Sequence, residues 1–245
     1  MSAASHSRDQ AVQSMFDRIA GRYDLLNRVI SFRLDTWWRA QAIRTILTND
    51  HPLVVDLGTG TGDLAFNAAR MTKGKARIIG LDFSMQMIRL AQTKRAEAKF
   101  GSSTAFIQAS AMSAPLQSEV FDGAMTAFVL RNISDLSFFF AEAFRVLKPG
   151  GKFVSLDMFP PTAGWFATFY AIYFYRIMPW IGGLISRDRN AYQYLSDSVR
   201  NFHSPEAVAG MINRAGFIHV SVRKFLNGAV CMHLAEKQSE PLPKS

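Results

Sequence analysis

Cysteine is almost absent from this sequence, because Cys231 is the only one among 245 residues. A single cysteine excludes an internal disulfide bond. The first residues also lack the basic start and the long apolar stretch of a secretion signal. These absences predict a reduced, cytoplasmic protein.

Long apolar runs and low-complexity tracts are also lacking, and no internal repeat is visible. Hydrophobic residues make up 49% of the chain and charged residues 19%, which excludes disorder and a multi-span membrane protein. The length predicts one structural domain with an elaboration. Only the ends, residues 1–8 and 238–245, have the polar or proline-containing composition of frayed tails.

Acidic residues are too few to balance the basic ones, so the formal net charge is +9. A positive surface attracts polyanions, and both nucleic acid and an anionic membrane face fit this description. Charge alone does not choose between them.

Hydrophobic spacing divides the chain into helical and strand segments. Apolar residues recur at helical spacing from residue 9 to residue 50, which predicts a helical cap over residues 1–50. Short apolar runs then alternate with helical stretches. The expected strands are 53–57, 76–82, 104–109, 121–127, 152–157, 217–225 and 229–236, and the expected helices between them are 64–71, 85–100, 135–147 and 205–215.

This alternation is typical of an α/β fold with a doubly wound, mostly parallel sheet. Ser84, and either Ser134 or Asp135, are placed to cap helices, and the letters KPGG at 148–151 should end one. The core would comprise residues 51–157 and 202–237. Residues 158–201 interrupt the alternation and form an aromatic-rich insertion.

A glycine-rich turn, DLGTGTGD at 56–63, follows the first expected strand. Gly58, Gly60 and Gly62 let the backbone turn sharply and let a ligand approach it closely. A glycine motif this short is also compatible with an ordinary strand-to-helix turn.

Asp82 ends the next strand, where a carboxylate can accept hydrogen bonds from both hydroxyls of a ribose. NAD enzymes share this arrangement, but their glycines are usually spaced GxGxxG to place a pyrophosphate on the helix N-terminus. Here Asp63 begins the helix, and its charge would repel a pyrophosphate but tolerate a sulfonium. The pattern therefore favours S-adenosylmethionine (SAM) over NAD.

Several segments together resemble the ubiquinone/menaquinone biosynthesis C-methyltransferases, the UbiE/MenG family. The resemblance extends from about Val12 to His233. Its motifs are DLGTGTGD at 56–63, LRN at 130–132, RVLKPGG at 145–151, YQYLSDS at 192–198, YDLLN at 23–27 and AGF at 215–217. The glycine motif and the RVLKPGG segment are common to many class I methyltransferases, whereas the YDLLN and YQYLSDS segments are more specific.

The chain departs from the family pattern mainly on the expected substrate side. It reads SFRLDTWW at 31–38, where the family commonly has SFGxHRxW, and LDMF at 156–159, where LEFS is usual. Ala127 replaces a usual serine, and His203 replaces a proline. The cofactor is therefore predicted more firmly than the substrate.

The resemblance implies a class I SAM-dependent methyltransferase, with a Rossmann-like sheet whose last strand is antiparallel. SAM would be held by the three motif glycines together with Thr61, Asp82, Ser110, Ala111 and Ala127. Taken alone, Ser110 fits a solvated turn equally well. Tyr23 would close over the cofactor.

The resemblance also implies that Arg131 takes part in proton transfer through a bound water. Arg131 and Tyr23 are therefore the two catalytic candidates that the resemblance implies. Without the resemblance, Arg131 fits a salt bridge to Asp157 or Asp82 equally well. His203 and His233 have a suitable ordinary pKa for a base, although an uninvolved surface or core histidine is the better interpretation of each.

The insertion predicts a greasy substrate. Arg176 is the one charge from 164 to 185, and aromatic residues crowd this stretch: Trp165, Phe166, Phe169, Tyr170, Tyr173, Phe174, Tyr175 and Trp180. Twelve uncharged residues before Arg176 are too few to cross a bilayer. The segment is either a buried helix or, as we expect, a lid for a prenyl tail or for docking on a membrane.

The sequence thus predicts SAM-dependent C-methylation of a prenylated quinol ring. No metal or covalent nucleophile is needed for such a transfer. We expect a cytoplasmic protein, with peripheral membrane contact and a homodimer left open. Other acceptors in secondary metabolism and a non-catalytic SAM-binding role are the alternatives. A nucleic-acid substrate is disfavoured, because AFVL at 127–130 lacks the proline-aromatic loop that grips a flipped base.

Overall fold

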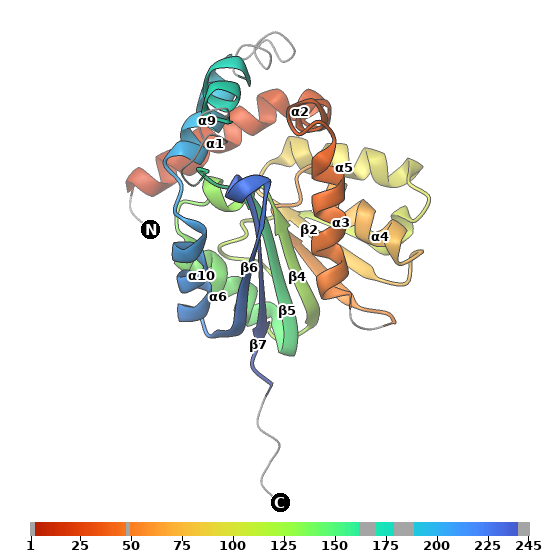
Figure 1. Ribbon diagram of the computed structural model, residues 1–245. Coiled ribbons are helices and arrows are strands. Elements are labelled where there is room, and N and C mark those ends of the chain that lie inside the picture. Colours follow the sequence, from red (N-terminus) through yellow and green to blue (C-terminus); the bar gives the residue numbers. More distant parts are fainter. Residues whose placement is uncertain (1–2, 48–49, 162–169, 179–188, 240–245) are drawn as a thin grey trace, which may run out of the picture.

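A seven-stranded sheet forms the centre of this computed structural model, which describes residues 3–47, 50–161, 170–178 and 189–239 (Figure 1). The strands are β1 (Leu53–Leu57), β2 (Arg77–Asp82), β3 (Thr104–Gln108), β4 (Phe121–Ala127), β5 (Leu147–Met158), β6 (Phe217–Phe225) and β7 (Val230–Lys237). Their order is β3-β2-β1-β4-β5-β7-β6. Strands β1 to β5 pair in parallel, and β7 is antiparallel to both neighbours. The predicted doubly wound sheet with an antiparallel last strand is confirmed.

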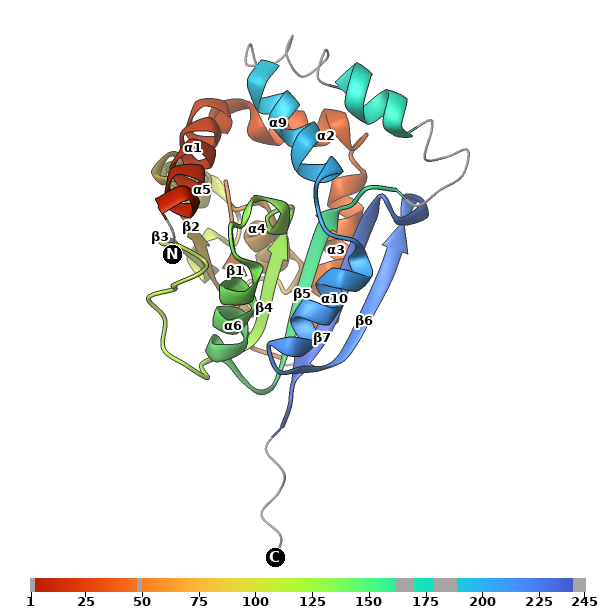
Figure 2. The same ribbon diagram turned by 90° about the vertical axis from the view of Figure 1, so that its left-hand side faces the viewer.

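Helices cover both faces of the sheet and one end. The helices are α1 (Ala3–Ile19), α2 (Tyr23–Ile30), α3 (Leu34–Ile46), α4 (Asp63–Met71), α5 (Met85–Glu97), α6 (Leu136–Val146), α9 (Arg189–Arg200) and α10 (Pro205–Arg214). Short turns of helix are η1 (Ala20–Arg22), η2 (Gly101–Ser103), η3 (Leu130–Asn132), η4 (Tyr173–Ile177) and η5 (Leu226–Gly228). Helices α1, α2 and α9 lie over the end of the sheet at which β4 finishes (Figure 2). Of the expected helical cap, α1 and α2 therefore lie above the carboxyl ends of the parallel strands, whereas α3 packs on one face of the sheet.

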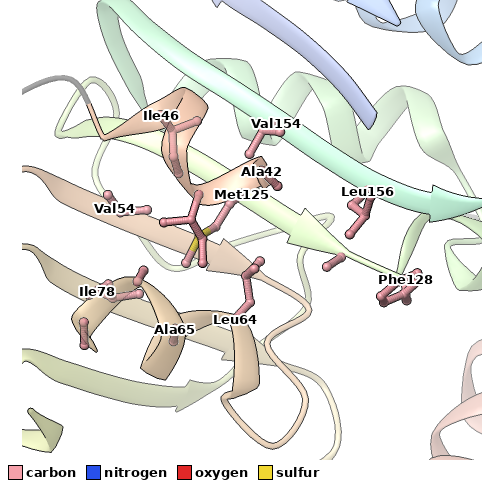
Figure 3. Close-up of a cluster of buried hydrophobic side chains, with 14 of the residues drawn as sticks. Ala42, Ile46, Val54, Leu64, Ala65, Ile78, Met125, Phe128, Val154 and Leu156 are labelled. Carbon is pink, nitrogen blue, oxygen red and sulfur yellow. The ribbon is translucent and has the colours of Figure 1, made fainter. Parts of the chain in front are cut away.

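Two hydrophobic layers hold the helices on the sheet. On one face, Ala42 and Ile46 of α3 and Leu64 and Ala65 of α4 pack on buried side chains of β1, β2, β4 and β5 (Figure 3). On the other face, α6 and α10 pack around Phe153 of β5. Because the inner strands β1, β2 and β4 are largely buried on both faces, their sequences are mostly apolar without alternation, whereas burial alternates along the edge strand β3.

Capping residues fall where the sequence predicts them. The Ser84 hydroxyl accepts a hydrogen bond from the Met87 N–H at 3.1 Å, and the Asp135 carboxylate accepts one from the Ser137 N–H at 2.9 Å. Most boundaries agree with the expectation to within three residues, and two differ by more. Strand β5 begins at Leu147 and not at residue 152, because Leu147 pairs with Phe121 before a register shift. Helix α1 begins at Ala3, inside the expected frayed tail.

The aromatic insertion is described in part. Trp165, Phe166, Phe169 and Trp180 lie outside the described residues, as does the side chain of Tyr175. Phe174 is buried, and the Tyr173 hydroxyl donates a hydrogen bond to the Ile30 carbonyl at 3.1 Å, which ties η4 to α2. In the described ranges, no helix combines the length and the hydropathy needed to cross a membrane.

Candidate functional site

The loops that follow β1 and β4 touch at the point where the strand order reverses. Gly58 has a φ of +78°, and a Cβ added to it would lie 2.6 Å from both methyl carbons of Val129. Any larger residue at position 58 would clash with the β4 loop and would be strained besides. In open α/β sheets, the carboxyl ends of the strands at this reversal are where ligands bind.

The middle of the glycine turn is held by the second strand. The Gly60 N–H donates to Asp82 Oδ2 at 2.8 Å, and the Ser84 N–H donates to Asp82 Oδ1 at 2.9 Å. Each carboxylate oxygen keeps a further lone pair for a ligand. The nearest group to a Cβ added at Gly60 is the Tyr23 ring at 3.8 Å, so this stretch of backbone is open to a ligand.

A cavity of about 700 Å³ lies above these residues. Six predicted site residues line it: Tyr23, Gly58, Gly60, Asp82, Ser110 and Ala111. Phe83 and Met87 add apolar wall on the side of β2. The size is that of a small-molecule site, and the lining offers two carboxylates, Asp9 and Asp82, in a mostly apolar surround.

Helix α1 forms part of this cavity, which the sequence analysis did not foresee. Asp9, Val12 and Phe16 line the cavity, and the Gln13 side-chain amide donates to the Phe83 carbonyl at 2.9 Å. The helical spacing of the apolar residues predicts the helix, but nothing in its sequence indicates which part of the sheet it covers.

Three other predicted residues lie behind the cavity wall. Gly62 has a φ of +86°, and an added Cβ would meet the rings of Phe66 and Phe106. The buried Thr61 hydroxyl donates to Asp24 Oδ1 at 2.6 Å. Ala127 is buried at the end of β4 and is not among the residues that line the cavity.

Thr61 belongs to an ion network that joins the glycine turn to the helical cap. Lys94 of α5 binds the Thr61 hydroxyl at 2.9 Å and pairs with Asp24 and with Asp63, the latter at 3.3 Å. Arg28 pairs with Asp63 at 2.6 Å and also with Asp35. The carboxylate at the start of α4 is therefore neutralised by cations from α2 and α5, and it does not line the cavity.

The two carboxyl groups beneath the glycine turn are hard to ionise. Burial raises the pKa of Asp56 to about 7, although a hydrogen bond from the Thr59 hydroxyl, 2.7 Å long, partly opposes this. Burial likewise raises the pKa of Asp82 to about 6, against the two backbone N–H groups that favour its charged form. At neutral pH, Asp82 is mainly a carboxylate and can accept hydrogen bonds from a diol.

A second cavity of about 320 Å³ lies beyond the end of β4. Its wall is mostly apolar and includes Trp38, Met158, Tyr173 and Phe174, but the buried Asp35 and Arg131 also line it. The Phe128 side chain lines both cavities. Phe128 thus forms a shared wall between the cavity over β1 and β2 and the cavity over β5 and β7.

Phe128 has an unusual backbone conformation. Its φ is +64°, its N–H donates to the Leu156 carbonyl at 2.7 Å, and the Arg39 guanidinium lies 5.0 Å from its ring centroid. A bulky residue at positive φ is strained, and such strain clusters at functional sites. Nothing in the letters of the sequence marks this conformation, so the sequence analysis missed the residue.

Arg131 lines the second cavity and forms the predicted salt bridge to Asp157. Arg131 Nη1 lies 2.5 Å from Asp157 Oδ1, and both side chains are buried. Burial alone would lower the pKa of Arg131, but the Asp157 carboxylate raises it, so the guanidinium stays charged. Among the described residues, Arg131 Nε and Asp157 Oδ2 have no hydrogen-bond partner. Buried polar atoms left open in this way indicate a place for a water or a ligand group.

The remaining titratable candidates lie away from both cavities. His233 is buried in the core, where Nε2 is 2.9 Å from the Pro205 carbonyl and burial lowers its pKa. His203 is on the surface in a polar groove of about 450 Å³ that also reaches Arg131. Burial raises the pKa of the Cys231 thiol to about 12, which makes it a poor nucleophile.

Tyr23 is the catalytic candidate on the side of the larger cavity, and it is not among the residues that line the smaller one. It lines the larger cavity, and its ring packs edge-on against Phe16 at 5.9 Å between centroids. Burial raises the pKa of Tyr23, and Arg131 and Arg39 only partly offset this. The phenol is therefore protonated at neutral pH and can serve as a hydrogen-bond donor.

Comparison with known proteins gives the same assignment across the whole chain. The model of the ubiE/COQ5 methyltransferase family matches residues 4–237. The chain is similar to a demethylmenaquinone methyltransferase of Thermus thermophilus, with 40% identity, covering 91% of this chain and 100% of the relative. It is also 41% identical to a ubiquinone/menaquinone biosynthesis C-methyltransferase UbiE of Syntrophotalea carbinolica, over 91% of this chain and 93% of the relative.

The fold has the same kind of neighbour among solved structures. A SAM-dependent methyltransferase from Thermotoga maritima superposes with a TM-score of 0.64 at 19% identity, covering 93% of this chain and 100% of that one. At this identity the likeness concerns the fold alone.

The buried carboxyl under the glycine turn predicts a pH-dependent stability. The folded chain binds the Asp56 proton more tightly than the unfolded chain, in which an aspartate titrates near pH ~3.9. The bound proton therefore stabilises the folded chain fully below about pH 4, and this stabilisation is lost as pH rises through about 7. The variant Asp56→Asn has no carboxyl to titrate. Between pH 5 and 8 its free energy of unfolding should therefore rise, relative to that of the native chain, by on the order of 2–4 kcal/mol.

Denaturant unfolding at several pH values measures this difference. Asp122→Asn is the matched control. Burial would raise the pKa of Asp122, but the hydrogen bond from Lys148 holds it below its usual range. The difference in free energy of unfolding between Asp122→Asn and the native chain should therefore stay constant above pH 5. An equally constant offset for Asp56→Asn would contradict the assignment.

Proposed function

The chain belongs to the ubiE/COQ5 methyltransferase family, and from this we propose that it transfers a methyl group from SAM to a ring carbon of a prenylated demethylquinol in isoprenoid-quinone biosynthesis. The observation that carries the proposal is the pair of adjacent cavities. One offers a diol-binding carboxylate, the other is mostly apolar with the buried charges of Arg131 and Asp35, and Phe128 lines both. This arrangement suits a transfer between a nucleoside donor and an aromatic acceptor.

The residues of the larger cavity fit SAM. Asp82 would accept the ribose hydroxyls, Gly58 and Gly60 leave room against the backbone, and Ser110 and Ala111 would border the adenine. Among the residues that the structure describes, no lysine or arginine lines the cavity to bind a pyrophosphate, and Arg28 and Lys94 are paired with carboxylates behind its wall. When bound, SAM supplies a methyl group on a positively charged sulfur, which the acceptor's ring carbon displaces.

The residues of the smaller cavity fit the acceptor ring. Trp38, Tyr173 and Phe174 would pack on an aromatic ring and the start of its tail. The Arg131 guanidinium would face the ring hydroxyl and stabilise the phenolate that makes the ring carbon nucleophilic. Asp157 acts through Arg131 as a positioning residue, because it holds the guanidinium from behind at 2.5 Å.

The proton of the ring hydroxyl needs a route out of the apolar cavity. A free arginine is a poor base, so a water at the open Arg131 Nε is the better acceptor. Arg131 also borders the polar groove that holds Asp197 and His203, which provides a path to solvent. Tyr23, Thr61, Gly62 and Ala127 keep their predicted roles as proposals. For Thr61 the role would be indirect, through the ion network.

Contact with the membrane, a cytoplasmic location and a homodimer also remain predictions. The first is supported by the lipid-like acceptor that the relatives' names imply and by the net charge of +9. Within the described residues nothing bears on the homodimer. The division into a cap, a core and an insertion at 158–201 likewise stays a proposal.

Replacement of Asp82 should weaken SAM binding without preventing folding. Asp82→Ala removes the proposed ribose contact and should raise the dissociation constant at least about tenfold in calorimetry. Asp122→Ala removes a carboxylate at the opposite end of the sheet and should leave the affinity within about twofold. Equal affinities of the native chain and Asp82→Ala would remove the ribose contact from the proposal.

The acceptor assignment is tested by transfer from radiolabelled SAM. We expect label on a ring carbon of a prenylated demethylquinol and none on the oxidised quinone, which has no hydroxyl to ionise. Transfer to a tail-less phenol, with none to the prenylated ring, would instead support a methyltransferase of secondary metabolism. Tight SAM binding with no transfer to any phenol or quinol would support a non-catalytic role.

Arg131 should matter for transfer and not for cofactor affinity. Arg131→Lys keeps the charge but loses the planar fork, and it should lower kcat about 100-fold while SAM affinity stays within about threefold. A more acidic acceptor phenol should recover much of the loss, because it needs less stabilisation of its anion. A uniform loss for acidic and ordinary phenols would indicate a merely structural role.

A further inference from the structure

Large apolar side chains are exposed mainly at one corner of the described chain. Seven of the ten exposed ones gather there: Leu25, Val29, Phe32, Leu34, Trp37, Ile172 and Leu226. We call these seven residues the apolar corner. Phe32 is 73% exposed and Leu25 57%. Isolated exposed apolar residues are ordinary, but a contiguous group of this kind marks a binding surface.

Contacts between the elements make the group contiguous. Leu25 and Val29 lie one helical turn apart on α2, and the chain then turns at Phe32 and Arg33 into α3. The Phe32 ring lies 5.7 Å from that of Tyr173, next to Ile172. The Trp37 ring lies 5.4 Å from that of Phe225, next to Leu226 at the tip of the β6–β7 hairpin. In Figure 2, α2, the segment that includes η4 and this hairpin tip lie at the same end of the molecule.

The apolar corner borders the smaller cavity. Phe32, Leu34 and Leu226 line that cavity and are exposed at the surface as well. Surface residues of the corner and Arg131 therefore line the same, mostly apolar cavity. An occupant of the corner would be continuous with the acceptor's binding site.

The charges around the corner are positive. Arg33, Arg176 and Arg223 are exposed, and the structure gives none of these three guanidinium groups an acidic partner among the described residues. The nearby carboxylates, Asp24 and Asp35, are engaged in the ion network. Exposed apolar side chains flanked by arginines that lack an acidic partner complement an anionic lipid surface.

We propose that the apolar corner docks on the anionic face of a lipid bilayer, so that the mouth of the smaller cavity opens into the membrane. The docking surface is thus assigned to α2, α3, the residue before η4 and the β6–β7 hairpin. Its purpose rests on the proposed function, since a prenylated acceptor would enter from the bilayer while its ring reaches Arg131. The docking itself does not depend on that acceptor.

Flotation with vesicles tests the surface. The native chain should float with vesicles of phosphatidylcholine and phosphatidylglycerol at low salt, and more weakly with phosphatidylcholine alone. Leu25→Glu/Ile172→Glu changes two corner residues that line neither cavity and should lower binding at least about tenfold. Arg33→Glu/Arg223→Glu should abolish the preference for anionic vesicles.

Met85→Glu is the matched control, because Met85 is an exposed apolar residue on α5 outside the corner. It should float within about twofold of the native chain, and thermal unfolding should show that all variants fold. A native chain that stays unbound, or a Leu25→Glu/Ile172→Glu variant that floats as well as native, would overturn the proposal. A dimer that this variant dissociates, with no lipid binding by the native chain, would assign the corner to a second copy instead.

Transfer assays separate this proposal from the enzymatic one. With a water-soluble, short-tailed demethylquinol, Leu25→Glu/Ile172→Glu should match the native rate. With a long-tailed acceptor embedded in vesicles, it should be slower by about tenfold or more. Equal rates from vesicles would contradict delivery through the corner. A native chain that methylates neither acceptor would overturn the proposed function and leave the flotation result standing.

Discussion

The contact between Gly58 and Val129 is the constraint on which the rest of the site depends. It lets the loops after β1 and β4 meet with only the Val129 side chain between their backbones. The Gly60 N–H of the β1 loop can then donate its hydrogen bond to Asp82, and the β4 loop can continue through Phe128 to Arg131. The donor cavity and the acceptor cavity are therefore built from two loops whose separation is fixed by one close approach.

The helical cap is attached to this junction mainly through charges. Asp24 and Arg28 of α2, Asp35 of α3 and Lys94 of α5 join the start of α4 in one network, and Thr61 connects it to the glycine turn. Partly buried pairs of this kind contribute little net stability, but they specify one arrangement strongly, because a broken pair leaves a buried charge. The residues that neutralise the charge of Asp63 at the start of α4 thus also position the helices that lie over the two cavities.

The sequence predicts much of this architecture because its local signals agree with one another. Apolar runs mark the buried strands, Ser84 and Asp135 mark helix starts, and the glycine spacing with Asp82 marks the donor cavity. The parts that could not be predicted depend on distant partners. Nothing local directs the Thr61 hydroxyl to Asp24 rather than to the cavity, and nothing local places a phenylalanine at positive φ. The second cavity is likewise made by segments more than a hundred residues apart.

The two cavities have different linings apart from Phe128, so their occupants need not share an entrance. The larger cavity lies toward β1 to β3 under α1, and the smaller lies toward β5 and β7 under the apolar corner. A spent nucleoside can leave into water while a hydrophobic acceptor remains in its own compartment. Such an enzyme exchanges its donor between turnovers while the acceptor stays bound. Donor and acceptor can then bind in either order.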